Sequence, residues 1–486
     1  MICLTYIRAL IANMDPLLLT YQVGPEPLLY DISTSLQPIS IRDQMFRGYM
    51  IINRALSEGL IKEWQQPPIL VVGAGVAGAM TAMTAVWHRI PTLLVEARSP
   101  FIQQIRGHTR FICPTQYDWP APHWGEGKYP WVGPDSPLDW NSGRASSVAL
   151  AWISKLNFML GRYPDLLTLI PAKFKSHRVI PESKTVEAFF EPPLAVEPLI
   201  CSIIISCAGF GSERHFIPDP DPQYTGYAFW DEDEFEQSDM GIKGKKPNVI
   251  VSGGGDGALQ DFIRITTRTS SARQIYTQIF DEPVHDIERM IHIAEDYAQR
   301  SYVWSTTGDL DHPIQQKLHD DYVVAINRIF SDSRLRRKVE GALEDIIGKL
   351  HKRLTIKLAY PCEHFSTCYP LNRFLVLLIA EYIRRTFGYD PLQPRTKILE
   401  VYGVNGHYCL NTAYLCHGED HEVIYAEALC STLNTAGEQE NSRVKLDGNP
   451  FNVVIIRHGI KAPSPPLGSL PTAAPPRQLI PYYIPW

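Results

Sequence analysis

One short segment constrains the fold of this chain more strongly than any other. The apolar run 69–72 leads directly into the glycine-rich turn 73–78, and a helix-forming stretch follows. A second apolar run, 92–95, ends at Glu96, which lies 23 residues after Gly73. Glycines in such a turn allow a sharp bend, a close approach of the backbone to a pyrophosphate and close helix–strand packing, while the helix N-terminus offers free N–H groups to phosphate. The segment therefore predicts a β-α-β unit of a parallel sheet that binds a dinucleotide.

The sequence VVGAGVAG…LLVEA in this unit resembles the N-terminal FAD-binding motif of flavoproteins of the glutathione-reductase and amine-oxidase type. In those families the motif holds the ADP half of FAD, so the resemblance implies FAD as a cofactor. The match covers residues 68–98, and the family's following Arg-x-Gly-Gly element is absent, with Arg98 as its nearest counterpart. The cofactor-binding residues expected in this unit are Gly73, Gly75, Val76, Ala77, Gly78, Glu96, Ala97 and Arg98.

Two later segments extend the resemblance. The end of the apolar stretch SIIISCAGFG, at Ala208 and Gly209, resembles the Ala-Thr-Gly strand end that such flavoproteins place near the FAD. The run NVIVSGGGDGALQDF (248–262) resembles the NAD(P)H-binding loop of two-domain flavoprotein reductases and monooxygenases, with a structural or degenerate half-unit as the alternative. The residues expected to bind this second cofactor, NAD(P)H, are Gly253, Gly255, Asp256, Gly257, Ala258 and Asp281.

Asp281 is expected to bind the ribose of that nucleotide, because it follows an apolar run, 274–280, that we interpret as the next strand. An acid at this position repels a 2′-phosphate and favours NAD. Arg268 and Arg273 lie nearby in the sequence and favour NADP, so the choice between the two nucleotides stays open.

The chain as a whole is expected to be an α/β protein with two Rossmann-like units, each built on a parallel sheet, and a helical insertion. Its 486 residues are enough for about three domains. Apolar residues recur at helical spacing between 283 and 390, which predicts helices there. The expected parts are an N-terminal arm (1–66), an FAD-binding domain (67–246), a second Rossmann-like unit (247–282 and 391–460), a helical insertion (283–390) and a Pro-rich tail (461–486).

An unusual concentration of tryptophan follows the first unit. Five of the ten tryptophans in the chain fall between positions 119 and 152. Aromatic rings pack well on flat ligands and arginine binds carboxylates in bidentate fashion, so this stretch is a candidate substrate pocket. The alternative is a surface loop held in place by aromatic residues and prolines. The pocket candidates are Arg106, His108, Arg110, Tyr117, His123 and Trp124.

Several elements of the related families are missing from the sequence. No close cysteine pair accompanies the first unit, where Cys113 stands alone, so dithiol chemistry is not expected. The flavin-monooxygenase fingerprint has no match, and the late Gly-Asp element that contacts the FAD ribitol is not found. Cys362, His364 and Cys368 lack an obvious fourth ligand, so no metal site is expected. The run 457–459 (Arg-His-Gly) lacks the second histidine element of a phosphohydrolase.

Charge and composition argue against other classes of function. The formal net charge of −6 argues against binding to nucleic acid or to a membrane surface. No apolar stretch is long enough for a transmembrane helix, and nine cysteines without an Asn-x-Ser/Thr acceptor favour a cytoplasmic location. The leading hypothesis is an FAD-dependent oxidoreductase in which NAD(P)H reduces the flavin and a small-molecule substrate is then reduced or hydroxylated. An amine or amino-acid oxidase and a non-catalytic dinucleotide-sensing module are the alternatives, and a homo-oligomer is left open.

Overall fold

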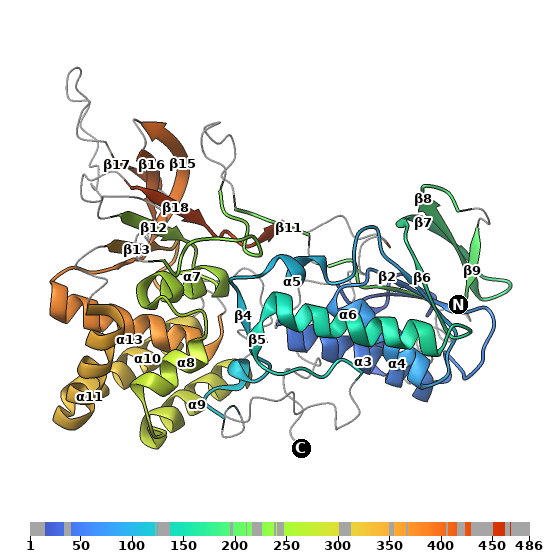
Figure 1. The fold of residues 1–486 in the computed structure, drawn as a ribbon, viewed down its shortest axis with the longest axis horizontal. Coiled ribbons are helices and arrows are strands. Elements are labelled where there is room, and N and C mark those ends of the chain that lie inside the picture. The colour runs from blue at the N-terminus through green and yellow to red at the C-terminus, as the bar shows by residue number, and fades with distance from the viewer. Residues whose placement is uncertain are drawn as a thin grey trace, which may run out of the picture. The chain divides into compact units, whose positions relative to one another are not determined.

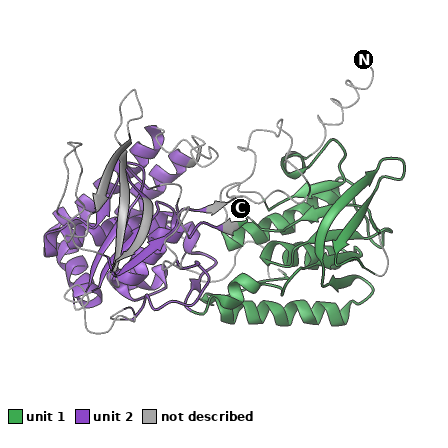
Figure 2. Ribbon diagram, turned by 90° about the horizontal axis from the view of Figure 1, so that it is seen from above, with its two compact units in different colours: residues 1–108, 127–212, 461–486 green, residues 109–126, 213–460 purple. Residues whose placement is uncertain are grey.

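The structure, a computed structural model, divides the chain into two compact units (Figure 2). Unit 1 comprises residues 1–108, 127–212 and 461–486, and unit 2 comprises residues 109–126 and 213–460. The residues that the structure describes are 15–33, 40–121, 124, 137–194, 198–209, 211–215, 226–237, 240, 247–300, 313–348, 354–365, 368–404, 407–415, 423–428, 451–461 and 467.

Unit 1 is built on a five-stranded sheet whose strands are all parallel. Four of the strands are buried at every residue but Leu93, as expected for a parallel sheet, whereas the edge strand 167–170 is buried only at Leu167. The strand order is β1 (Leu29–Asp31), β10 (Ile204–Ser206), β2 (Ile69–Val72), β3 (Thr92–Val95) and β6 (Leu167–Ile170). The helices of this unit (Figure 1) are α2 (Pro16–Tyr21), α3 (Ile41–Ser57), α4 (Val76–Trp87), α5 (Ile102–Arg106) and α6 (Ala145–Arg162).

A smaller antiparallel sheet accompanies the parallel one. It consists of β7 (Lys173–Ile180), β8 (Thr185–Glu191) and β9 (Leu199–Cys201). The sequence suggests one continuous strand over 199–206, and the structure divides this stretch between the two sheets. The division falls at Ser202, whose N–H group donates to the carbonyl oxygen of Pro68 (2.9 Å), so the chain leaves β8 and joins β2.

The N-terminal residues are part of unit 1 and not a separate arm. Strand β1 forms the edge of the parallel sheet, where Leu29 pairs with Ile204. Helix α3 also packs closely on α4, because a Cβ at Gly48 would lie only 2.6 Å from the carbonyl oxygen of Ala77. The structure therefore differs from the expected boundary at residue 66, since the first 66 residues supply both an edge strand and a covering helix.

Unit 2 contains a second parallel sheet, with the order β14 (Leu392–Gln393), β13 (Thr355–Ala359), β12 (Asn248–Ser252) and β18 (Val453–Ile456). An antiparallel sheet of β15 (Thr396–Val404), β16 (His407–Leu415) and β17 (Val423–Ala428) accompanies it. The helices are α7 (Asp256–Thr267), α8 (Ala272–Ile279), α9 (His285–Arg300), α10 (Pro313–Ser331), α11 (Ser333–Leu343) and α13 (Pro370–Phe387), with a 3-10 turn at Gln116–Asp118 and a π-helical turn at Glu344–Gly348. The remaining strands form two small two-stranded sheets, β4 (Phe111–Ile112) with β5 (Gly143–Arg144) and β11 (Ser212–Glu213) with β19 (Ile460–Lys461).

Two expectations for unit 2 are wrong in their secondary structure. The run 274–280, expected to be a strand, lies almost entirely in helix α8, whose N-cap Ser271 accepts a hydrogen bond from the N–H group of Gln274. Its buried residues Ile275, Tyr276 and Ile279 lie on one helical face. The strand that follows β12 in the sheet is instead β13, which interrupts the region 283–390 expected to be helical throughout.

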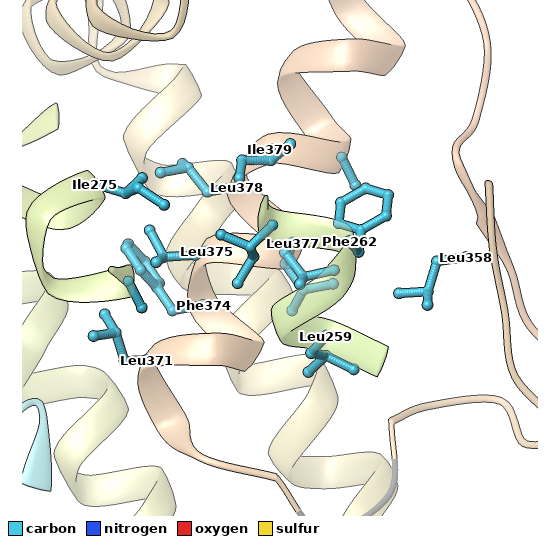
Figure 3. Packing of buried hydrophobic residues seen from close by; sticks show 14 of the residues in the cluster. Leu259, Phe262, Ile275, Leu358, Leu371, Phe374, Leu375, Leu377, Leu378 and Ile379 are labelled. Atoms are coloured by element: carbon cyan, nitrogen blue, oxygen red, sulfur yellow. The ribbon is translucent and has the colours of Figure 1, made fainter. Parts of the chain in front are cut away.

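The core of unit 2 lies among its helices. Figure 3 shows Phe374, Leu375, Leu377 and Leu378 of α13 packed with Ile275 of α8 and with residues of α7. Helix α13 is buried on nearly all sides, which explains its almost continuous apolar sequence. Among the described residues, no helix is both long and apolar enough to span a bilayer.

The tryptophan-rich stretch contributes to two separate cores. Trp119 is 1% exposed and packs on Tyr276 and Phe374 in unit 2, with ring centroids 5.6 and 4.9 Å away. Trp140 and Trp152 pack edge to face in unit 1 at 5.5 Å. These three side chains are therefore buried in packing contacts of two separate units and do not line one aromatic pocket.

Candidate functional site

The first glycine turn connects β2 to α4 at the carboxyl edge of the unit 1 sheet. Gly73 has φ of +97°, and a Cβ there would lie 2.6 Å from the carbonyl oxygen of Cys207. A Cβ at Gly78 would lie 1.7 Å from the carbonyl oxygen of Gly73. Gly75 differs from both, because it has φ of −72° and no atom lies within 4 Å of its Cβ position. The fold itself requires Gly73 and Gly78, whereas the open space at Gly75 suits the approach of a ligand.

Glu96 lies against this turn, as the sequence predicts. Its Oε2 atom accepts a hydrogen bond from the N–H group of Ala74 (2.7 Å), and Oε1 accepts one from Arg98 (2.8 Å). Val76 and Ala77 form the buried first turn of α4, while Ala97 and Arg98 are exposed. The carboxylate is thus fixed beside the turn and keeps further lone pairs for hydroxyl donors.

The same edge continues through β10 to β1. After β10, Ala208 is exposed and Gly209 adopts φ of +86°. At the end of β1, Asp31 is 4% exposed, and its Oδ1 atom accepts hydrogen bonds from the N–H group (2.9 Å) and the hydroxyl of Ser33. Burial raises the pKa of Asp31. Sequence reasoning missed this carboxylate because only the parallel pairing of β1 with β10 brings it to the edge.

Unit 2 repeats this construction with the same strand order, since β14-β13-β12-β18 corresponds to β6-β3-β2-β10. Three hydrogen bonds between strand ends match in the two units. The bond from Gly73 N to Val95 O (2.7 Å) in unit 1 matches that from Gly253 N to Ala359 O (2.8 Å) in unit 2. The bond from Cys207 N to Val72 O (2.7 Å) matches that from Arg457 N to Ser252 O (2.8 Å). The bond from Glu96 N to Ile170 O (3.1 Å) matches that from Tyr360 N to Gln393 O (3.0 Å).

The glycines of the second turn match those of the first. Gly253 has φ of +143°, and a Cβ there would lie 2.3 Å from the carbonyl oxygen of Arg457. Gly255 is the N-cap of α7, and Ala258 is fully buried at the position of Gly78. Gly459, with φ of +81°, matches Gly209. Both turns therefore have the same backbone construction, a glycine turn between a parallel strand and the N-terminus of a helix.

The side chains around the second turn differ from those around the first. Tyr360, not an acid, occupies the position of Glu96. Asp281 does not end a strand but follows α8, where its side chain is 76% exposed and paired with Lys338. The expectation that Asp281 binds the ribose is therefore corrected, because helices α9 to α11 separate it from the strand that lies beside β12.

Asp256 and Gly257 begin α7 and contact other parts of unit 2. The Oδ1 atom of Asp256 accepts hydrogen bonds from the N–H group of Tyr369 (2.8 Å) and from Nδ2 of Asn372 (2.7 Å). Burial raises the pKa of Asp256 to about 7. A Cβ at Gly257 would contact Arg457 Cδ at 3.5 Å and the ring of Phe229 at 3.7 Å. Asp256 thus links the N-termini of α7 and α13.

The pocket candidates do not form one group. Arg106 and His108 are exposed in unit 1, whereas Arg110, Tyr117 and Trp124 belong to unit 2. The ring of Tyr117 packs on Tyr369 at 4.4 Å, and that of Trp124 packs on Tyr276 at 5.1 Å. His123 lies outside the described residues.

Arg110 is a buried structural residue and not a substrate-binding one. Its side chain is 2% exposed and donates to Asp261 and to the carbonyl oxygen of Phe229 (2.5 Å). Asp261 also accepts from Arg457 Nε (2.7 Å) and Arg264 Nη1 (3.3 Å). Burial alone would raise the pKa of Asp261, but the three guanidinium groups hold it well below its ordinary range. Among the described residues, no group of His, Cys, Asp or Glu could hold a metal ion.

Comparison with known proteins gives structural neighbours only. No protein-family model matches the chain, and no curated protein matches it. Solved structures that resemble it include thioredoxin reductase from Lactococcus lactis (10% identity, 82% of this chain and 79% of the other, TM-score 0.36). Another is the bacillithiol disulfide reductase of Bacillus cereus (10% identity, 81% and 77%, TM-score 0.37). A third is an ornithine N-hydroxylase from Kutzneria sp. 744 (10% identity, 81% and 80%, TM-score 0.34). The α/β assignment itself rests on the strand order and hydrogen bonds described above.

Proposed function

We propose that this chain is an FAD-dependent oxidoreductase in which unit 1 binds the ADP half of FAD and unit 2 binds NAD(P)H. The substrate would be a small molecule that is reduced or hydroxylated. The observation that carries the proposal is the repeated strand-end geometry, because a chain with two dinucleotide-binding edges has a place for two nucleotide cofactors.

The residues of unit 1 fit the ADP half of FAD. The open space at Gly75 leaves room for a pyrophosphate beside the N-terminus of α4, where N–H groups and the helix dipole favour negative charge. Glu96 is held beside the turn with lone pairs free for ribose hydroxyls. Asp31 offers a second carboxylate at the same edge, three strands from β3, and unlike Glu96 it is buried.

The chemistry would be divided between cofactor and protein. When bound, a flavin accepts hydride from a nicotinamide and delivers electrons to a substrate or to oxygen. The chain's own residues bind and orient: the glycine turns receive phosphate, Glu96 holds the ribose, and the buried strands β2 and β10 exclude water beneath the cofactor.

Visible spectroscopy tests this function directly. The purified protein should carry a flavin spectrum that bleaches when NADH or NADPH is added without oxygen. Bleaching only with an amine would replace the proposal by an amine oxidase. A colourless protein that binds nucleotide without turnover would overturn both enzyme functions in favour of a sensing module.

A matched pair of glycine variants tests the place of the flavin. Gly75→Val should lose bound flavin without unfolding, because no protein atom lies within 4 Å of the Cβ position. Gly161→Val in α6 is the control, since its Cβ position is equally open and lies away from the turn. If Gly75→Val keeps its flavin as the control does, the first glycine turn is not the cofactor site.

A further inference from the structure

The second glycine turn carries a polar pair that the first turn lacks. The hydroxyl of Ser252, the last residue of β12, lies 2.8 Å from Nε2 of His458, which follows β18. The matched hydrogen bonds assign Ser252 to the position of Val72 and His458 to that of Ala208. Two polar side chains therefore replace two apolar ones at the same point of an otherwise repeated backbone.

Burial and the surrounding charges determine the protonation state of the His458 imidazole. Burial, together with the positive charges of Lys397 and Arg214, lowers the pKa of His458 to about 4. The ring is then neutral at pH 7, and the 2.8 Å contact with Ser252 fits either tautomer. In the tautomer whose Nε2 accepts the Ser252 proton, Nδ1 carries the hydrogen and donates to an anion. His458 is only partly buried, so a ligand can reach it.

Arg214 and Lys397 are the two cations whose charges act on His458. Arg214 is exposed, and its backbone is paired with the segment of His458 through His458 N to Arg214 O (3.2 Å) and Arg214 N to Gly459 O (2.8 Å). Lys397, in β15, is also exposed. The adjacent acid, Glu213, is already bound by Arg457 Nη1 (3.1 Å) and by the N–H group of Phe229 (2.6 Å). The site therefore combines the neutral imidazole of His458 with two exposed cations, and the carboxylate of Glu213 is already paired with other groups.

We propose that Arg214, Lys397 and His458 bind a phosphate group of the unit 2 ligand on the β18 side of the second glycine turn. The inference rests on the proposed nucleotide function of unit 2 and adds side-chain recognition to it. Charge-assisted hydrogen bonds to phosphate are stronger than neutral ones, and arginine suits the geometry of the anion. Unit 1 has Ala208 at the matching position, so its edge would bind phosphate mainly through backbone N–H groups.

Titration calorimetry with inorganic pyrophosphate at low salt tests the site on the full chain. His458→Ala, which installs the residue found in unit 1, and Arg214→Gln should each weaken binding about tenfold, which is the range of one lost charge-assisted bond. Arg214 is exposed, so its variant should keep the melting temperature even if His458→Ala lowers it. Lys175→Gln, an exposed cation of β7 in unit 1, is the control and should bind as the wild type does.

The outcomes separate this inference from the function beneath it. Pyrophosphate or NADPH binding that is unchanged in His458→Ala and Arg214→Gln overturns the phosphate site. If NADPH still bleaches the flavin in those variants with the wild-type dissociation constant, the proposed function survives and only the phosphate site is lost. A wild type that binds neither pyrophosphate nor NADPH overturns both the site and the nucleotide function of unit 2.

Discussion

Asp261→Asn is the substitution for which the structure gives the clearest expected cost. The carboxylate is fully buried and lies among Arg110, Arg264 and Arg457, whose side chains are no more than 3% exposed. Asparagine keeps the shape of the side chain but removes its charge. The three guanidinium groups would then share one fewer buried counter-charge, and at least one of them would lose its acceptor.

The expected cost follows from two opposing effects. Removing one partner of a buried ion pair costs about 3–5 kcal/mol, because the remaining charge stays desolvated. Asp233 still neutralises part of the network, through Arg264 Nη2 at 2.8 Å and Arg110 Nη2 at 3.4 Å, and the amide oxygen still accepts one hydrogen bond. We therefore expect a loss near the lower limit, about 3 kcal/mol, a large part of the ~5–15 kcal/mol that stabilises a typical protein.

Urea unfolding of wild type and variant measures this loss. Asp286→Asn is the control, because Asp286 is 82% exposed in its 3.4 Å pair with Arg328, and exposed pairs contribute less than about 1 kcal/mol. The pKa of Asp261 is depressed in the folded state, so its contribution is present above its ordinary pKa and falls only as the pH drops through the folded pKa. The difference between variant and wild type should thus be constant from pH 6 to 8. A loss below about 1 kcal/mol, or one that changes across this interval, would refute the account.

Three further outcomes follow from the described geometry. Burial raises the folded-state pKa of Asp256 to about 7, so its ionisation lowers the stability of the wild type as the pH rises from about 4 to 7. Between pH 5 and pH 8 the free energy of unfolding of Asp256→Asn should therefore rise by about 2–3 kcal/mol relative to that of the wild type, as measured by urea unfolding. Parallel pH profiles for the two proteins would contradict this. Gly253→Ala should lose more than about 1–2 kcal/mol of unfolding free energy, because its Cβ would lie 2.3 Å from a carbonyl oxygen and its φ is +143°. Gly341→Ala in α11 has open space at its Cβ position and should gain up to about 1 kcal/mol. Equal effects of the two substitutions in thermal unfolding would exclude strain at Gly253. Asp31→Asn should weaken flavin retention about tenfold with little change in melting temperature, and an unchanged flavin dissociation constant would remove Asp31 from the cofactor site.

The first unit could be predicted from sequence because its signals are local. The 28 residues 69–96 contain the strand, the glycine turn, the helix, the second strand and Glu96. Each of these elements has a residue type within it that indicates its conformation. Asp31 could not be found in this way. Nothing around it distinguishes it from other acids, and its position depends on β1 pairing with a strand 175 residues later, Leu29 with Ile204.

The error at α8 has a different physical cause. A short apolar run fits a buried strand and a buried helix face equally well, so periodicity alone does not separate them. The deciding signal was Ser271, an N-cap three residues before Gln274. Because of this error, Asp281 was assigned to the position of Glu96, whereas the residue at that position in unit 2 is Tyr360. Tyr360 follows Gly253 by 107 residues and lies after an inserted helical region, so local sequence patterns do not connect the two.

The repeated backbone with different side chains argues that the two edges do not bind the same ligand in the same way. In unit 1 the edge carries the carboxylate of Glu96 and the apolar residues Val72 and Ala208. In unit 2 the acid is replaced by Tyr360, while Ser252 and His458 replace the apolar pair next to two cations. This difference between the two edges is the basis of the proposed contacts, with a ribose in unit 1 and with a phosphate group in unit 2.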